Sequence, residues 1–460
     1  MGRTRNVKLA AVIAQTGLSQ ARLATRVGSV ATEHGADELA NVGQSHIAKW
    51  VSGVVPDPPG PRILAETLSR TLGRLVTPTD IGLTADSETE PPAWSDDTLT
   101  ALVTLGSKDM VDIDRRQLLA KSVYSVAALA ALPEEGWFER AMDRAQTRRP
   151  LSSYVVTDQD VEDVREMAAI FSRRDQKRGG RAGRAALVAY LRTDIAELLS
   201  GRFLSENIRR EMTSAAAELA YLAGWTGFDG GEHTIAQHWL TIATKLAEEA
   251  GDAPLAGHAL RAMAHQAVDL GHPQQAVRLA EASLSSRRYA HACWRERSLL
   301  GVVHARGLAA AGEKKAAVAA LLRAEQDLGR ARDGDDEPNR VFFYTEASLA
   351  HETAAALRDL GDLPGAEAQF TRSVRTRRAQ FVRTHSVTLG YLGAVQAQQG
   401  HLDMACATWS QALDAMTGVQ SGRARETVVQ MRRSLSPFRN RAGSHAAELD
   451  ARARSMLSRA

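Results

Sequence analysis

Apolar residues recur at helical spacing through the first eighty positions of the chain. In the stretch from Val42 to Gly53, Ile47, Trp50 and Val51 lie at i, i+3 and i+4 and form one apolar stripe. The opposite side of this stretch is polar. A solvated surface helix explains that polar side, and so does a helix that contacts a ligand. Together with its neighbours, this spacing predicts four short helices, over residues 7–15, 19–27, 42–53 and 61–72.

A second pattern repeats in the C-terminal half. Four segments begin with glycine and carry small or apolar residues five and nine positions later, starting at Gly271, Gly312, Gly361 and Gly400. Each glycine is expected to end one helix, and the small fifth residue lets the next helix pack closely against it. Residues 215–252 are similar to an earlier, degenerate copy. Residues 151–460 are therefore predicted to form stacked helix pairs.

These segments resemble the tetratricopeptide repeat, whose helix pairs stack into a superhelix with a concave groove. Their glycines are 41, 49 and 39 residues apart. The standard repeat has ~34 residues, so longer helices or loops are expected. A groove of this kind suits a peptide, a small molecule or a partner protein. The candidate groove residues come from the first helix of each pair and are Arg261, His265, His304, Arg306, Tyr344, Glu346 and Tyr391.

The segment between these two regions, residues 84–150, is predicted to hold a linker and a connecting helix. Residues 84–97 combine five acids and two prolines with no basic residue, which is typical of a solvated linker. Residues 112–133 look like a twin-arginine export signal but begin more than a hundred residues from the start. They are predicted to form a buried helix that ends at Pro133. The N-terminal domain is then assigned to residues 1–83.

Composition favours an all-α protein with a local basic region. Aromatic residues make up only 5%, and good helix formers dominate. The net charge of +3 does not by itself indicate a polyanion partner. Residues 1–83, however, hold nine Lys and Arg against six acids, three of which lie in residues 28–43. The rest of that domain is basic, as a surface facing phosphates requires.

Two stretches of the N-terminal domain resemble the lambda-repressor-like (XRE) family of helix-turn-helix regulators. "LSQARLATRVG" is similar to the second helix of that family, and "VGQSHIAKWVSG" to its recognition helix. The resemblance implies that Gln44, Ser45, His46 and Lys49 face base edges and nearby phosphates of double-stranded DNA. It also implies that Gln20 braces the phosphate backbone. The alternative is a helical domain in which Lys49 is incidental.

The connection between these two helices departs from the family pattern. A turn of ~3 to 4 residues is usual, yet residues 28–43 intervene here. This insert carries Glu33, Asp37 and Glu38, so it must point away from phosphates. It resembles a longer connection found in a subset of actinobacterial regulators, which share "RILAETLSRTLGRLVTPTDIGL" after the recognition helix.

The chain shows no motif for catalysis, metal binding or a cofactor. It has no Walker loop, no HExxH and no nucleophile elbow, so we expect no catalytic residues, no metal and no cofactor. Cys293 and Cys406 are far apart, which excludes a disulfide framework and suits a reducing cytoplasm. No stretch reaches the ~18 to 20 apolar residues of a membrane helix, and no membrane partner is expected.

The sequence favours an N-terminal helix-turn-helix domain followed by a tetratricopeptide-like α-solenoid. The corresponding function is a cytoplasmic transcription regulator that reads an operator, with a solenoid that dimerises and senses a ligand. The first alternative is a protein-interaction scaffold whose helix-turn-helix is a remnant that does not bind DNA. The second is an enzyme with an unrecognised site in the helical region. Specific binding to an operator would distinguish the regulator from the scaffold. Turnover of a substrate or a bound cofactor would be needed to support the enzyme.

Overall fold

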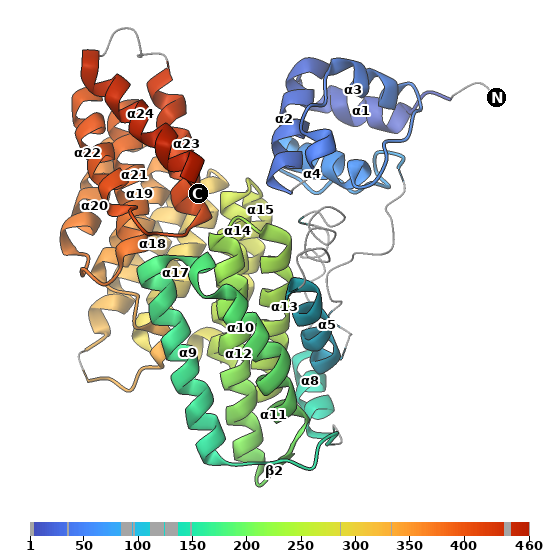
Figure 1. The fold of residues 1–460 in the computed structure, drawn as a ribbon, viewed down its shortest axis with the longest axis vertical. Helices are drawn as coiled ribbons and strands as arrows, with labels where there is room; N and C mark the ends of the chain where they lie inside the picture. The colour runs from blue at the N-terminus through green and yellow to red at the C-terminus, as the bar shows by residue number, and fades with distance from the viewer. Residues whose placement is uncertain are drawn as a thin grey trace.

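The computed structural model describes residues 4–34, 36–83, 94, 97–110, 124, 137–147, 150–285, 287–332, 334–436 and 443–459. Within these ranges the ordered elements are helices, apart from one pair of two-residue strands. Figure 1 shows a small N-terminal helical domain beside a larger stack of paired helices. The all-α fold class predicted from the sequence is confirmed.

The N-terminal domain packs short helices around a core of its own. Its elements are α1 (Val7–Gln15), α2 (Gln20–Glu33), η1 (Asp37–Leu39), α3 (Gln44–Val51) and α4 (Gly60–Leu72). Asn6 and Ser19 accept main-chain N–H groups at the starts of α1 and α2. All four α-helices contribute to the core, whose large members include Leu9, Leu23, Ile47, Trp50, Leu64 and Leu68. In the predicted apolar stripe of the third helix, Ile47 and Trp50 are therefore buried as expected, and Val51 is half-buried against the same core.

The segment predicted to connect α2 and α3 is shorter than expected. Helix α2 does not end at Val27 but continues to Glu33, because Val30 and Ala31 extend its buried face at helical spacing. Gly28 lies inside the helix, and a Cβ there would come within 2.5 Å of the Ala40 carbonyl oxygen. Glycine therefore allows the returning chain to pack directly against the helix. The true connection begins at His34.

Two of the described helices lie in sequence between the N-terminal domain and the stack. They are α5 (Thr98–Met110) and α8 (Trp137–Thr147), and both pack against α13 (His233–Ala250). The predicted linker over 84–97 and the predicted helix over 112–133 lie almost entirely outside the described residues. Tyr124 is the described member of the second segment, and it is fully buried.

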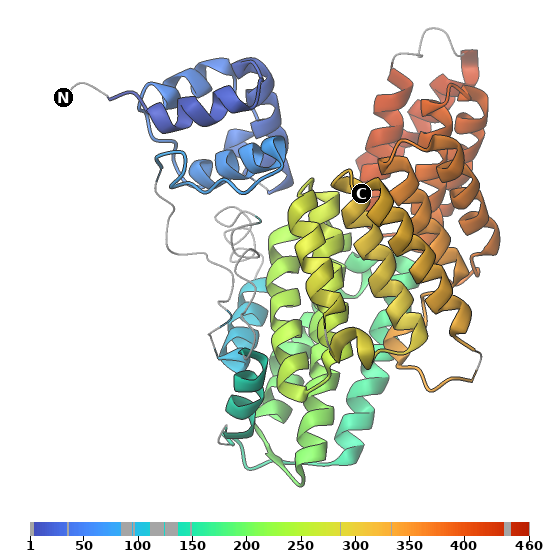
Figure 2. The same ribbon diagram turned by 180° about the vertical axis from the view of Figure 1, so that it is seen from behind.

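The stack consists of antiparallel helix pairs, seen from both sides in Figures 1 and 2. The pairs are α12 (Glu206–Asp229) with α13, α14 (Ala253–Asp269) with α15 (Pro273–Leu284), α17 (Trp294–Ala310) with α18 (Lys314–Arg330), α19 (Glu346–Asp359) with α20 (Leu363–Thr376), and α21 (Val382–Gln398) with α22 (Leu402–Ala415). The short α16 (Arg287–Ala290) and η5 (Asn339–Val341) lie in connections. Helices α23 (Gly422–Leu435) and α24 (Gly443–Arg459) follow the last pair.

The four glycines that mark the repeats occupy the turns inside the pairs. Gly271, Gly312, Gly361 and Gly400 have φ of 78°, 80°, 83° and 88°, the left-handed region that glycine adopts without strain. The small residues five positions later, Ala276, Ala317, Ala366 and Ala405, are fully buried. The repeat pattern and its physical reason are both confirmed. The degenerate copy over 215–252 is also confirmed as a helix pair, formed by α12 and α13.

A first layer of helices precedes the pairs. It contains α9 (Asp158–Arg178), η3 (Gly180–Ala182), α10 (Arg184–Tyr190), the π-helix η4 (Leu191–Ile195) and α11 (Ala196–Ser200). Strands β1 (Val155–Val156) and β2 (Arg202–Phe203) pair in parallel, with Val155 opposite Arg202. These two strands tie the start of α9 to the start of α12.

The first layer also meets the far end of the stack. Arg383 of α21 donates to Asp229 of α12 at 3.0 Å and to Asp175 of α9 at 3.1 Å, and all three side chains are buried. The Gln420 N–H donates to the Arg178 carbonyl at 2.7 Å, just before α23. We call Asp175, Asp229, Arg383 and Gln420 the clasp. It joins helices that are early and late in the sequence, so the stack is closed on itself rather than open-ended.

Candidate functional site

Helix α3 presents one buried and one exposed face. Ile47 and Trp50 point into the domain core, whereas Gln44, Ser45 and His46 are exposed. Lys49 is also exposed, in the last turn. No described part of the stack covers these four side chains.

The start of α3 is set by local hydrogen bonds. The helix begins directly after Gly43, whose N–H donates to His46 Nδ1 at 3.2 Å. This bond holds the imidazole against the start of the helix. Gln20 lies in the first turn of α2 and is half-buried. The five residues predicted to contact DNA thus include four exposed side chains on one short helix, while Gln20 lies on the neighbouring helix.

A second feature joins the N-terminal domain to the stack. Glu66 of α4 accepts from Arg70 Nε and from His272 Nε2, both at 2.7 Å, and Arg70 also donates to Glu33 at 2.6 Å. The Tyr124 ring stacks on His272 with centroids 5.7 Å apart. Burial would raise the pKa of Glu66, but Arg70 and His272 outweigh it and lower this pKa to about 2. Glu66 is therefore an ionised carboxylate buried between the two domains.

The stack contains a cavity of about 750 Å³. It opens between the ends of α12, α14, α17 and α19, with α21 and α23 on the far side. Its cationic lining residues are Arg181, Arg306, Arg358, Arg423 and Arg425. Its acidic lining residues are Glu33, Asp269, Asp359 and Glu426. Glu33 comes from α2, so the N-terminal domain contributes to the wall of this cavity.

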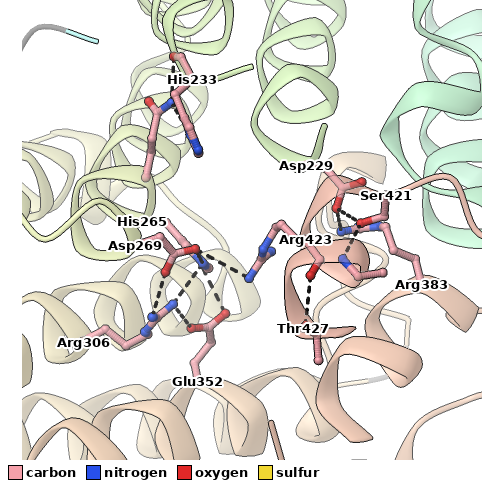
Figure 3. A network of polar contacts seen from close by, with 12 residues as sticks. Asp229, His233, His265, Asp269, Arg306, Glu352, Arg383, Ser421, Arg423 and Thr427 are labelled. Atoms are coloured by element: carbon pink, nitrogen blue, oxygen red, sulfur yellow. Dashed lines mark hydrogen bonds and ion pairs between the residues drawn. The ribbon is translucent and has the colours of Figure 1, made fainter. Parts of the chain in front are cut away.

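One wall of the cavity is an ion network centred on Arg306 (Figure 3). Arg306 donates to Asp269 and to Glu352, each at 3.1 Å, and contacts His265 Nε2 at 2.9 Å. Burial lowers the pKa of His265 well below its usual value, and the neighbouring Arg306 lowers it further. His265 is therefore neutral and accepts from the guanidinium. Arg306 is held rigidly by three partners.

Arg423 enters the same cavity from the first turn of α23 and points toward Asp269 in Figure 3. Its guanidinium is 3.8 Å from Asp269 and lies 5.3 Å from the centre of the Phe228 ring. The neighbouring Ser421 donates to Asp229 at 3.0 Å, which fixes the start of α23 to the clasp. The clasp thus places Arg423.

Two of the seven side chains predicted for the groove line this cavity, namely Arg306 and Tyr391. His265 lies directly behind Arg306. Arg261 is buried between α12 and α14, where it donates to the Tyr221 hydroxyl at 2.8 Å. Arg261 is outside the cavity because its turn of α14 faces α12.

The other three predicted groove residues lie elsewhere. Tyr344 is buried with its hydroxyl 3.1 Å from Ser298, and His304 is half-buried. Glu346 is exposed and pairs with Arg372 of α20 at 2.8 Å. None of the three lines the cavity. Arg423 and Glu33, which do line it, were not predicted, because each lies outside the repeated pattern.

The described residues also lack the features of two other kinds of site. Among them, no group of three or more His, Cys, Asp or Glu side chains is arranged to hold a metal ion. Nor does any described helix have the length and apolar character needed to cross a membrane.

Residues 9–84 match the family described as the SP15 N-terminal domain. This match covers the N-terminal helical domain. No curated protein matches the chain in sequence. Among solved structures, the chain is similar to a crystal structure of a Rap protein complexed with competence and sporulation factor. The two share 12% sequence identity with a TM-score of 0.41, over 65% of this chain and 87% of that one.

Proposed function

We propose that this chain is a cytoplasmic transcription regulator that binds DNA through α3, and not an enzyme. The observation that carries the proposal is the division of α3 into two faces. Ile47 and Trp50 hold it on the core, and a continuous polar face remains open to a ligand. An exposed helix of this size fits the major groove, where side chains reach base edges.

The sequence resemblance to lambda-repressor-like regulators supports the same assignment. In that family the helix equivalent to α3 reads bases, which would give Gln44, Ser45 and His46 this role. Gln and Lys side chains have natural base or phosphate partners. Gln20 at the start of α2 would hold a phosphate, as helix N-termini commonly do. In this proposal α3 supplies specificity and α2 supplies position.

The test begins with genome-wide mapping of bound DNA, which gives an operator. Gln44→Ala and His46→Ala should then weaken binding to that operator by ~1 to 3 kcal/mol each and relax base preference. Lys49→Ala distinguishes two roles. If Lys49 contacts a base, its variant should behave like the first two. If Lys49 contacts a phosphate, its variant should bind all sequences more weakly, and the slope of log affinity against log salt concentration should fall in magnitude by about one.

The matched control is Ser29→Ala, an exposed position on α2 distant in sequence from its first turn. It should bind like wild type. If the Gln44, His46 and Lys49 variants also bind like wild type, α3 does not read DNA. The protein-interaction scaffold then becomes the better description of this chain.

We further propose that the stack senses a ligand in its cavity. A volume of about 750 Å³ lies within the ~300 to 1,000 Å³ of ordinary ligand sites. The occupant would be a peptide, a small molecule or a segment of a partner protein. Because Glu33 belongs to both the cavity wall and the N-terminal domain, an occupant can favour one arrangement of the two domains over another.

The stack is also proposed to form a homodimer. A single module of this size covers little DNA, and paired half-sites are the usual remedy. Light scattering of the full chain should give twice the monomer mass, and the bound operator should be a pseudo-palindrome. A monomer with and without operator would contradict this part of the proposal.

A further inference from the structure

Arg423 has fewer partners than the other enclosed arginines of the stack. Its closest carboxylate oxygen, on Asp269, is 3.8 Å away. Its Nε has no hydrogen-bond partner among the described residues, a feature that it shares with Arg306 and Arg383. By contrast, Arg306 has two carboxylates at 3.1 Å, and Arg383 of the clasp has two at 3.0 and 3.1 Å. The Arg423 side chain is 15% exposed, so its guanidinium is only partly enclosed and can still bind an anion.

Most of the acids that face the cavity also pair with other arginines. Asp269 is already taken by Arg306, and Asp359 by Arg358 at 2.8 Å. Glu33 is taken by Arg70 of α4 at 2.6 Å. Three of the four acidic lining residues therefore have a cation of their own.

Two other cationic lining residues donate to carbonyl groups of the main chain. Arg181 donates to the Gly230 carbonyl at 3.0 Å and Arg425 to the Leu457 carbonyl at 2.9 Å. Neither bond neutralises a charge, because a carbonyl oxygen is neutral. The fourth acid, Glu426, lies 3.9 Å from Arg433. Arg306 has Glu352 as a second carboxylate, so what distinguishes Arg423 is the 3.8 Å distance to its closest carboxylate.

We propose that the cavity binds an organic carboxylate and that Arg423 anchors it. A guanidinium presents paired N–H donors that match the two oxygens of a carboxylate. Phe228 and Tyr391 supply apolar surface beside Arg423, with Val268 and Leu270 at the end of α14. This apolar wall favours an anion with an organic body over inorganic phosphate. The inference rests on the proposed ligand-sensing function and names the chemistry that the ligand must have.

The carboxylate has two natural sources, the C-terminus of a short peptide and a free organic acid. Both present the same group to Arg423. A peptide would also place main-chain N–H and carbonyl groups against the polar wall. The test therefore includes both sources and an anion without an organic body.

The experiment measures the thermal unfolding midpoint of the full chain at constant ionic strength. The probes are an acetylated alanine pentapeptide with a free carboxylate, the same peptide as its C-terminal amide, octanoate, and inorganic phosphate. Binding to the folded state alone raises the midpoint, by about 2 °C once the probe exceeds its Kd roughly tenfold. We expect this rise with the pentapeptide carboxylate or octanoate, and not with the amide or phosphate.

The variants are Arg423→Gln and the matched control Arg433→Gln, on the same helix but exposed and outside the cavity. The rise should disappear in Arg423→Gln and persist in Arg433→Gln. Without any probe, Arg423→Gln should unfold close to the wild-type midpoint, because the closest carboxylate to this guanidinium is 3.8 Å away. A strong loss of stability there would make Arg423 a structural residue and overturn the inference.

Three other outcomes would also overturn the inference. The first is an equal shift from the carboxylate and amide peptides with none from octanoate. The second is a shift that is largest with phosphate, and the third is no shift with any probe. A larger shift with the pentapeptide than with octanoate identifies the peptide as the source, and the reverse identifies the free acid. No DNA is present in these measurements. Failure here would therefore leave the proposed role of α3 intact, and failure of operator binding would leave this site intact.

Discussion

Replacing Glu66 with glutamine tests whether the contact between the domains stabilises the folded protein. The substitution keeps the shape of the side chain and removes its charge. Glu66 is only 4% exposed, so solvent screens its partners little. A pKa lowered from 4.5 to about 2 corresponds to ~3 kcal/mol of stability at pH 7. Arg70 keeps its second partner Glu33 in the variant, so we expect a loss of ~2 to 3 kcal/mol.

The assay is urea denaturation of the full chain, followed by tryptophan fluorescence at several pH values. Because the folded pKa of Glu66 is depressed, its contribution is fully present above pH 4.5 and is lost as the pH falls toward 2. The difference between wild type and Glu66→Gln should therefore shrink over that range. At pH 7 it should be at its largest.

Glu33→Gln is the matched control, since Glu33 binds the same arginine but is 39% exposed. Solvent screening should limit its loss to below ~1 kcal/mol. Equal losses from the two variants, or a Glu66→Gln difference that does not change with pH, would refute the argument that burial between the domains gives this pair its strength.

Three further predictions concern single positions. Trp50→Ala should leave a void in the small N-terminal core and cost ~3 to 5 kcal/mol, which circular dichroism melts of the full chain would detect as an early transition. Gly224→Ala should cost ~1 to 3 kcal/mol by denaturant unfolding, because the new Cβ would lie 2.7 Å from Leu240 Cγ and 3.1 Å from its main-chain nitrogen. Burial lowers the pKa of His238 to about 4, so its neutral form stabilises the fold above pH 6.5 and that stability is lost as the pH falls toward 4. His238→Gln should accordingly flatten the pH dependence of the unfolding free energy between pH 6.5 and 4, by up to ~1.4 kcal/mol per pH unit.

Local signals made much of the fold predictable. The apolar stripe of α3 could be predicted from three residues within about one helical turn. The role of the repeat glycines could be predicted from the nine positions that follow each of them. The end of α2 was wrongly placed because Gly28 resembles a helix terminator, whereas here it admits the close approach of Ala40. Its true role depends on a neighbour that sequence spacing does not reveal.

The cavity was less predictable than the fold. Arg306 and Tyr391 could be predicted as lining residues because they belong to the first helices of pairs. The prediction was wrong for Arg261 because its turn of α14 faces α12. Arg423 lies after the last repeat, so no period pointed to it. Glu33 reaches the cavity only through the placement of one domain on another. Both positions depend on contacts between residues far apart in the chain.

The clasp changes how such a stack is expected to fold. An open solenoid is stabilised mainly between neighbouring repeats, so it can fray from its ends and fold piece by piece. Here Arg383 and Asp175 are 208 residues apart in sequence, and their contact forms only after the intervening helices are in place. Such a contact adds chain-closure entropy to the folding barrier and slows folding. Because of this contact, α21 and α23 should not unfold separately from the rest of the stack, as the terminal repeats of an open solenoid can. Hydrogen exchange should find them protected to nearly the same degree as α12, with the stack opening as one cooperative unit.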